Sequence, residues 1–134
     1  FTLTPVLSWR TIISEIKHLP AGSKIGYEGT EELKKDSIIA VCPIGYWHGL
    51  PRNLSSIGQV LVKDERCKIL GRVSMDMITI DISKVPGPKV GDTVTVIGED
   101  KKVKVLADEL ANLAGTINYE IVTRLNPLVR RIYF

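Results

Sequence analysis

The sequence predicts a mainly β fold, a closed or partly closed β-barrel-like domain with one short helix near the C-terminus. Val, Ile and Thr are frequent throughout the chain, and these β-branched residues favour strands. Short apolar runs recur at close spacing and are separated by turn signals rich in Gly, Pro and Asp. No linker, internal repeat or low-complexity segment interrupts this pattern, so we expect residues 1–134 to form a single domain.

Most of the expected strands are short and follow turn signals. Residues 2–17 alternate loosely, and Pro5 would restrict that end to a strand start or a sheet edge. Residues 37–42 form a compact apolar run that is typical of a strand buried on both faces. In residues 77–82 isoleucines alternate with polar residues, which predicts one buried and one polar face. Further strands are expected over residues 59–62, 67–73, 93–97 and 128–134.

One helix is expected, over residues 107–114. Its apolar residues fall on one face at helical spacing, namely Leu106, Leu110, Leu113 and Ala114. Asp108 and Glu109 lie in the first turn, where carboxylates interact favourably with the positive end of the helix dipole. Gly115 suits a left-handed C-terminal cap, which would end the helix there.

The composition excludes several classes of protein. With 44% hydrophobic residues the chain is too apolar for disorder, and no apolar run reaches the roughly 18 residues that span a bilayer. The net charge of +3 arises from interleaved acidic and basic residues, without the basic stripe of a nucleic-acid-binding surface. We therefore expect no nucleic-acid partner, see no membrane segment, and interpret the pairs 34–35 and 101–102 as solvated lysines at loop tips.

The cysteines and the first residues bear on cellular location. Cys42 and Cys67 lie in apolar contexts far from a second Cys or a paired His, which argues against a zinc site and against a disulfide-stapled secreted domain. No metal site is expected. Residues 1–5 have no basic region and no initiating Met, so they do not resemble a secretory signal and suggest an excised domain. A reducing, cytoplasmic location fits these features best.

Three segments break the strand pattern with polar residues, at places where a site could lie. Residues 26–30 and 43–49 each place a tyrosine beside glycine, and residues 71–76 put polar groups between two strands. The plain alternative interprets them as strand-end tyrosines, turn glycines and a β-bulge. His18 and His48 stand alone, as loop histidines do. The chain contains no phosphate-binding glycine loop, metal-ligand spacing or nucleophile motif.

These segments belong to an ordered set of motifs that resembles the C-terminal domain of alanine racemases, pyridoxal-phosphate enzymes that interconvert L- and D-alanine. The set runs nearly from end to end: Pro5–Ser8, Pro20–Gly22, Gly26–Tyr27, Pro43–Tyr46 with Gly49, Gly71–Val73 with Met75–Asp76, Val90–Asp92, Ala107–Leu110, Gly115–Glu120 and Arg131–Tyr133. Single members such as Gly-Tyr are weak signals, whereas the ordered set is specific.

The resemblance implies that the chain is part of a larger enzyme. In that family an N-terminal α/β barrel holds pyridoxal phosphate covalently on a lysine, and the β-domain leans over the barrel mouth of the other subunit of a homodimer. The chain is too short for the roughly 250 residues of such a barrel, so the cofactor lysine lies outside it. The implied partners are L- and D-alanine, the N-terminal barrel and a second copy of the protein. The domain alone is expected to be inactive.

Tyr27 matches the tyrosine that serves in this family as the second catalytic base, on the L-face of the substrate α-carbon. Racemisation needs one acid or base on each face of a planar carbanion, and the cofactor acts as the electron sink. A phenol ordinarily titrates near about pH 10, so a tyrosine base needs a nearby cation. In the family this cation is an arginine of the barrel.

Other positions match residues that bind the substrate and the cofactor. Tyr46 and Met75 match residues that line the substrate pocket, Met75 through its backbone amide near the substrate carboxylate. Tyr119 matches the tyrosine whose hydroxyl contacts the cofactor phosphate. The family's substrate entryway corresponds to Arg52, Arg72 and Ile117, and two cations there would attract an anionic amino acid.

The sequence departs from the family pattern beside two of these positions. Glu28 and Glu31 replace a small residue and a second aromatic after the catalytic tyrosine. Because a carboxylate near the phenol would oppose its ionisation, we expect Glu28 to point to the opposite face of a strand. Trp47 and His48 replace Ala and Asp. The alternatives are therefore a racemase of serine or another amino acid, and a non-catalytic β-domain for dimerisation or binding.

Overall fold

Strands make up most of the regular secondary structure, and the computed structural model describes all of residues 1–134. The main sheet contains β1 (Trp9–Ile12), β2 (Glu15–Leu19), β5 (Ser37–Cys42), β6 (Gln59–Val62), β7 (Glu65–Leu70), β8 (Ile78–Asp81), β9 (Thr93–Asp100) and β10 (Val103–Val105). A separate hairpin contains β3 (Lys24–Ile25) and β4 (Glu31–Glu32). The helices are α1 (Ala107–Ala114) and α2 (Asn118–Thr123), and short 3-10 turns are η1 (Tyr27–Gly29), η2 (Tyr46–His48) and η3 (Arg52–Leu54).

The main sheet is antiparallel and follows the order β1-β9-β6-β7-β8-β5-β2, with β10 paired to β9. Its two end strands, β1 and β2, are halves of one extended segment joined by Ile13 and Ser14. The Ile13 amide donates to the Asp92 carbonyl (3.0 Å) and the Ser14 amide to the Val41 carbonyl (2.8 Å). One continuous segment therefore belongs to both edges of the sheet, which produces the barrel-like form that the sequence predicts.

A cluster of 25 buried residues forms the core of this sheet. Its members on the strands include Ala40, Val60, Ile69, Ile80 and Val96. The two helices lie beside the sheet and add Leu110, Ala111, Ala114 and Ile121 to the same cluster. The core therefore holds β7 and β8, the two strands that residues 71–77 connect.

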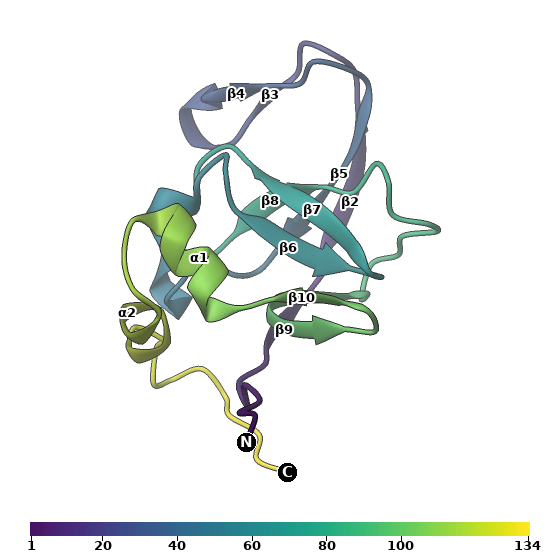
Figure 1. Cartoon of the computed structure of the whole chain (residues 1–134). Helices are drawn as coiled ribbons and strands as arrows, with labels where there is room; N and C mark the ends of the chain where they lie inside the picture. The colour runs from purple at the N-terminus through teal and green to yellow at the C-terminus, as the bar shows by residue number, and fades with distance from the viewer.

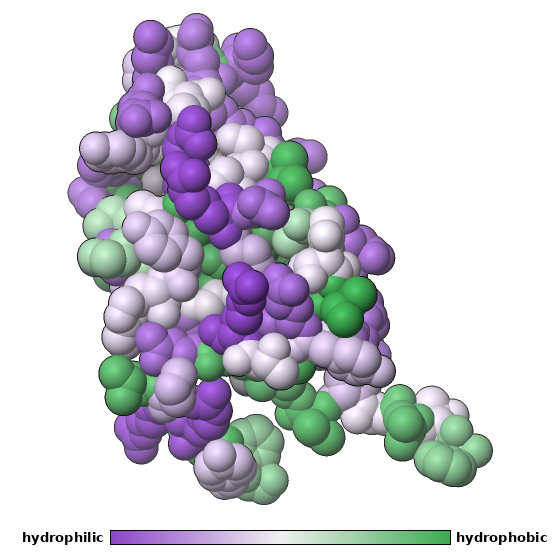
Figure 2. Space-filling model, turned by 90° about the vertical axis from the view of Figure 1, so that its left-hand side faces the viewer, coloured by the Kyte–Doolittle hydropathy of each residue, from purple (hydrophilic) through white to green (hydrophobic).

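The β3–β4 hairpin projects from the end of the molecule opposite to the two termini (Figure 1). It packs on the sheet through a second cluster of four buried residues: Ile25, Leu33, Ile39 and Leu70. Ile39 belongs to β5 and Leu70 to β7, so two strands of the main sheet carry the hairpin. Figure 2 shows that hydrophilic residues cover this end, whereas hydrophobic residues are more frequent toward the termini.

The strand predictions are confirmed over most of the chain, with corrections at both ends. The runs 37–42, 59–62, 77–82 and 93–97 correspond to β5, β6, β8 and β9. The run 67–73 overlaps β7, but this strand begins at Glu65 and ends at Leu70, so the prediction is wrong for residues 71–73. The strand expected from residue 2 begins only at Trp9, because the preceding residues pair with no strand. The strand expected over residues 128–134 is wrong: its side chains are largely exposed and no strand lies beside it.

The predicted helix is confirmed as α1, and Gly115 forms its left-handed cap with φ 75°. Its buried residues are Leu110, Ala111 and Ala114, whereas Leu106 and Leu113 are exposed, so the predicted face is only half right. The sequence did not predict α2, because half of the residues of this short helix are β-branched and only Ile121 is buried. Neither helix has the length and apolar character needed to cross a membrane.

The position of the core predicts that replacing Ile80 by alanine lowers the stability of the domain strongly, whereas replacing Ile12 lowers it little. Ile80 is 0% exposed and Ile12 is 47% exposed. Ile80→Ala should lower the free energy of unfolding by about 2–5 kcal/mol, since it removes buried methyl groups and leaves a cavity. Ile12→Ala, the control, should cost less than about 1 kcal/mol. Urea unfolding measures both, and equal losses would contradict this core.

Candidate functional site

Tyr27 lies in η1, the turn that connects the two strands of the β3–β4 hairpin. The Gly29 amide donates to the Gly26 carbonyl (3.0 Å) and closes the turn. Gly26 (φ 82°) and Glu28 (φ 67°) both lie in the left-handed region, so the backbone reverses within a few residues. The Tyr27 side chain is 75% exposed. The turn therefore presents a phenol to the outside of the domain.

Backbone contact holds this turn against residues 71–77, which connect β7 to β8 and are called the 71–77 connection below. A Cβ atom on Gly26 would lie 3.1 Å from the Arg72 amide nitrogen and 3.3 Å from Gly71 Cα. A Cβ atom on Gly71 would lie 2.9 Å from the Ile25 carbonyl oxygen. The two backbones touch at glycines, where neither has a side chain. This contact places the beginning of the Tyr27 turn beside Arg72.

Glu28 turns toward Arg72, and its Oε2 lies 3.8 Å from the Arg72 Nε. This Nε is buried and has no hydrogen-bond partner. The expectation that Glu28 alternates with Tyr27 across a strand is wrong in its premise, because residues 27–29 form a 3-10 turn. The carboxylate offsets part of the positive charge of Arg72.

Glu31, at the start of β4, accepts hydrogen bonds from three other segments. The Gly71 amide and the Ser56 hydroxyl (2.7 Å) donate to Oε2, and the Lys68 Nζ (2.6 Å) donates to Oε1. Burial by itself raises the pKa of the Glu31 carboxyl, but the donors Lys68, Gly71 and Ser56 outweigh it and hold the pKa below its ordinary value of 4.5. Glu31 is therefore an ionised carboxylate that ties the hairpin to the end of β7.

Tyr46 lies in η2, which docks on the 71–77 connection at Ser74 and Met75. The Tyr46 amide donates to the Ser74 carbonyl (3.0 Å) and the Trp47 amide to the Met75 carbonyl (2.9 Å). A Cβ atom on Gly45 would lie 2.1 Å from the Ser74 carbonyl oxygen, so only glycine permits this approach. Tyr46 and Met75 are therefore neighbours through their backbones.

Three further contacts hold the η2 turn. The Gly45 amide donates to His48 Nδ1 (3.0 Å), and because an amide can only donate, this nitrogen carries no proton. On the other side a Cβ atom on Gly49 would lie 2.6 Å from the Arg124 carbonyl oxygen. The Asn126 side-chain amide donates to a carbonyl of the turn (2.9 Å). The turn is held between the 71–77 connection and residues 124–126.

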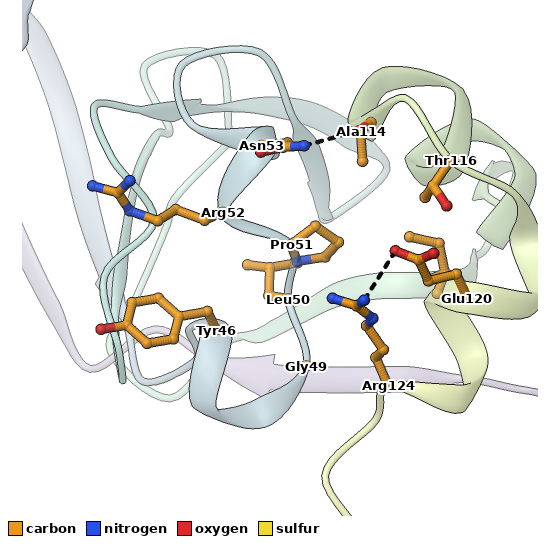
Figure 3. A pocket seen from close by; sticks show the side chains of 11 residues that line it. Tyr46, Gly49, Leu50, Pro51, Arg52, Asn53, Ala114, Thr116, Glu120 and Arg124 are labelled. Carbon is orange, nitrogen blue, oxygen red and sulfur yellow. Dashed lines mark hydrogen bonds and ion pairs between the residues drawn. The ribbon is translucent and has the colours of Figure 1, made fainter.

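A pocket of about 700 Å³ opens beside this turn (Figure 3). Tyr46 and Arg52 line one side of it, and Glu120 and Arg124 form an ion pair (3.5 Å) on the other. The Asn53 side chain donates to the Ala114 carbonyl (3.1 Å), which links η3 to α1. One pocket therefore contains two of the residues for which the resemblance implies roles.

Ile117 and Tyr119 lie at the beginning of α2, where Ile117 is the N-terminal cap residue. Both are exposed, and their neighbours Thr116 and Glu120 line the same pocket. The Tyr119 hydroxyl, on a side chain that is 73% exposed, can donate a hydrogen bond to a phosphate oxygen. The exposed Tyr119 hydroxyl is therefore suited to supply one hydrogen bond to the phosphate group of pyridoxal phosphate.

The buried cysteines contribute no nucleophile to this site. Cys42 and Cys67 are free, and burial, with a smaller contribution from nearby groups, raises the pKa of each thiol to about 12. A thiol with such a pKa is not ionised at neutral pH, and the thiolate is the reactive form.

The structure gathers the predicted residues around the 71–77 connection and the pocket. The Tyr27 turn contacts this connection through Gly26, near Arg72, and the Tyr46 turn docks at Ser74 and Met75. Sequence reasoning missed the anchoring by Glu31 and Asn126. The only sequence signal for Glu31 was a carboxylate where the family pattern has an aromatic residue, and Asn126 had no signal.

Comparison with known proteins identifies relatives over nearly the whole chain. The family model for the alanine racemase C-terminal domain matches residues 6–133. The alanine racemase of Leptospira interrogans is 42% identical over 132 residues, which are 98% of this chain and 34% of that protein. The alanine racemase of Halothermothrix orenii is 46% identical over 131 residues, 98% of this chain and 35% of that protein. The chain thus spans about a third of the length of the curated relatives it matches.

Solved structures agree with this result. The crystal structure of alanine racemase from Streptomyces lavendulae superposes with a TM-score of 0.92 at 32% identity, over 98% of this chain and 34% of that chain. The structure of alanine racemase from Bacillus anthracis with bound L-Ala-P superposes with a TM-score of 0.87 at 38% identity, over 93% of this chain and 32% of that chain.

The close approach at Gly45 predicts that Gly45→Ala displaces the η2 turn. The added methyl group overlaps the Ser74 and Met75 backbones, so we expect a loss of about 2–3 kcal/mol in unfolding free energy and faster amide exchange over residues 45–49. Gly87→Ala is the control for exchange at residues 45–49: a Cβ atom there meets open space, and its cost comes only from the positive φ of 54° at that position. Hydrogen exchange measured by mass spectrometry compares them, and unchanged exchange at residues 45–49 in Gly45→Ala would refute the docking.

Proposed function

The chain belongs to the family of alanine racemase C-terminal domains, and from this premise we propose that it is the β-domain of an enzyme that interconverts L- and D-alanine. The match of the family model to residues 6–133 carries the proposal. Because the relatives are about three times as long, the activity requires the rest of the protein, where we place the barrel and the cofactor lysine. We also propose a homodimer in a reducing, cytoplasmic location, in line with the two free thiols.

In this proposal Tyr27 moves the proton on the L-face of the substrate α-carbon. Pyridoxal phosphate, when bound, supplies the electron sink for the carbanion. A planar carbanion needs a second acid or base on the opposite face, which we assign to the barrel lysine. The geometry of η1 supports the role: the phenol is exposed while its backbone is held against Arg72, and a base must reach another surface from a fixed position.

Met75 and Tyr46 would bind the substrate side by side. The Met75 amide donates no hydrogen bond within the chain, so it remains able to donate to a carboxylate. The hydrogen bond from Trp47 to the Met75 carbonyl fixes the orientation of this segment. Because the proposed contact is made by the backbone, replacement of the Met75 side chain should affect activity little.

The remaining residues are assigned to the substrate entryway and to the cofactor phosphate. Arg52 and Arg72 would attract an anionic amino acid into the entryway, with Ile117 as an apolar wall. The ion pair with Glu28 reduces the contribution of Arg72 to this field. Tyr119 would donate its hydroxyl proton in a hydrogen bond to the cofactor phosphate.

The substrate test should include serine beside alanine. Trp47, half-exposed and next to Tyr46, occupies a position where the family pattern has alanine. A bulky indole beside Tyr46, which we place in the substrate site, would change the space available to the substrate side chain. Turnover of L-alanine well above L-serine by the full-length protein would support alanine as substrate, and the reverse order would assign the enzyme to serine.

The isolated 134-residue chain should neither racemise alanine nor retain pyridoxal phosphate. The physical reason is that the covalent lysine and most phosphate ligands are placed outside this chain. After incubation with the cofactor and dialysis, we expect the visible absorption spectrum to equal that of untreated chain. A visible band that survives dialysis, or L-to-D turnover by the chain alone, would contradict this.

In the intact enzyme Tyr27 should act on the cofactor of the partner subunit, and Tyr119 on that of its own chain. The test co-expresses two inactive variants of the full-length protein, one without the barrel lysine and one with Tyr27→Ala. A mixed dimer then contains one complete site if Tyr27 acts across the interface. With random mixing about half of the dimers are mixed, so co-expression should restore roughly a quarter of wild-type turnover.

Each single variant, expressed alone, is the control for this complementation. If Tyr27 served its own subunit, every site in the mixture would lack one base, and mixing would restore nothing. No recovery in a preparation with verified mixed dimers would therefore remove Tyr27 from the role across the interface.

A further inference from the structure

We propose that Glu31 is a positioning residue for Tyr27: its carboxylate fastens the β3–β4 hairpin to the end of β7 and thereby fixes where the phenol lies. The inference rests on the proposed role of Tyr27 as a base. It concerns a position to which the family resemblance assigns no role.

The hairpin is too short to define the position of its own turn. Its strands contain two residue pairs, Lys24 with Glu32 and Ile25 with Glu31. Beyond them, Leu33 accepts a backbone hydrogen bond from Gly22 and donates one to Ser23. A two-stranded hairpin of normal length is already marginal in water, and this one has two residue pairs. The position of η1 must therefore come from contacts with the rest of the domain.

Gly71 meets both arms of the hairpin. Gly26, just before Tyr27, packs against the Gly71 and Arg72 backbone, and Glu31, shortly after the turn, accepts the Gly71 amide proton. Tyr27 thus lies between two attachment points that converge on one residue. The first is a van der Waals contact without direction, whereas the second is a charge-assisted hydrogen bond with a defined geometry.

Lys68 and Ser56 hold the carboxylate in the orientation that reaches Gly71. Ser56 shares Oε2 with Gly71, and Lys68 occupies Oε1. The Glu31 side chain is only 16% exposed, so water cannot easily replace these partners. Removing the carboxylate would leave the Gly71 amide and Lys68 without their acceptor at a partly buried place.

Neighbouring carboxylates do not duplicate this contact. Glu28 makes only a 3.8 Å ion pair with Arg72, and its side chain is 63% exposed, where such pairs contribute little. Glu32 is exposed and makes no ion pair or side-chain hydrogen bond within the chain. Among the three glutamates of the hairpin, Glu31 alone joins it to the sheet through several polar groups.

The test uses the full-length protein that carries this chain, with Glu31→Ala, Glu31→Gln and Tyr27→Phe, and Glu32→Gln as the matched control. Glu31→Gln keeps the side-chain length but loses the charge, so it should fold if Glu31→Ala does not. One readout is amide exchange of residues 24–32 and 68–74, followed by mass spectrometry. The other is deuterium uptake from heavy water at the α-carbon of L-alanine and of D-alanine.

Glu31→Ala should speed amide exchange in both segments and slow deuterium uptake by L-alanine about tenfold or more, with a smaller loss for D-alanine, which the barrel lysine serves. Glu31→Gln should lie between Glu31→Ala and wild type, and Glu32→Gln should match wild type. Equal losses for both enantiomers, or unchanged uptake by L-alanine in both Glu31 variants, would overturn the positioning role. If Tyr27→Phe itself leaves L-alanine uptake unchanged, the proposed base fails instead, so the two failures are distinguishable.

Discussion

The candidate site depends on one constraint: two turns that carry tyrosines meet the same stretch of backbone, the 71–77 connection. Gly26 allows the Tyr27 turn to touch Gly71 and Arg72, and Gly45 allows the Tyr46 turn to touch Ser74 and Met75. A Cβ atom at Gly45 would overlap the Ser74 and Met75 backbones, and one at Gly26 would lie tight against Gly71 and Arg72 at a φ of 82° that disfavours other residues. Steric exclusion at these glycines, more than attraction between the functional side chains, determines which groups become neighbours.

This connection can serve as a platform because the sheet and its loops hold it on several sides. It joins β7 to β8, whose inward residues belong to the main core. The Gly71 carbonyl accepts the Ser56 amide proton (2.9 Å), and the Ser55 hydroxyl accepts the Val73 amide proton (2.8 Å). Charges complete the arrangement, since Glu28 faces Arg72 while Glu31 faces Lys68. The electrostatic design is thus local: two of the three carboxylates of the hairpin are each paired with one cation, Glu31 with Lys68 of β7 and Glu28 with Arg72 of the connection.

The sequence was sufficient for the parts of the fold that repeat a simple pattern. The alternation at Ile78–Ile82 predicted β8, and Gly115 predicted the end of α1, because both depend on local geometry alone. It did not predict α2, whose composition gives no helical signal, and it failed at residues 128–134, where a strand-like composition has no partner strand in the chain. At the site it found the tyrosines through the family pattern. It misplaced Glu28 and missed the anchoring by Glu31, because a left-handed turn and contacts between distant segments leave no periodic signal.

The way in which Tyr27 is attached separates its folding role from its chemistry. The groups that fix its position are its neighbours: the glycine before it, the backbone of Gly71, and the carboxylate of Glu31. The phenol ring itself is mostly exposed and belongs to neither apolar cluster. Removing the ring therefore costs the domain little packing, while removing an attachment displaces a ring that is still present. A large exposed aromatic side chain on a fixed backbone is suited to a surface that meets another surface, because its free energy of burial remains available for that contact.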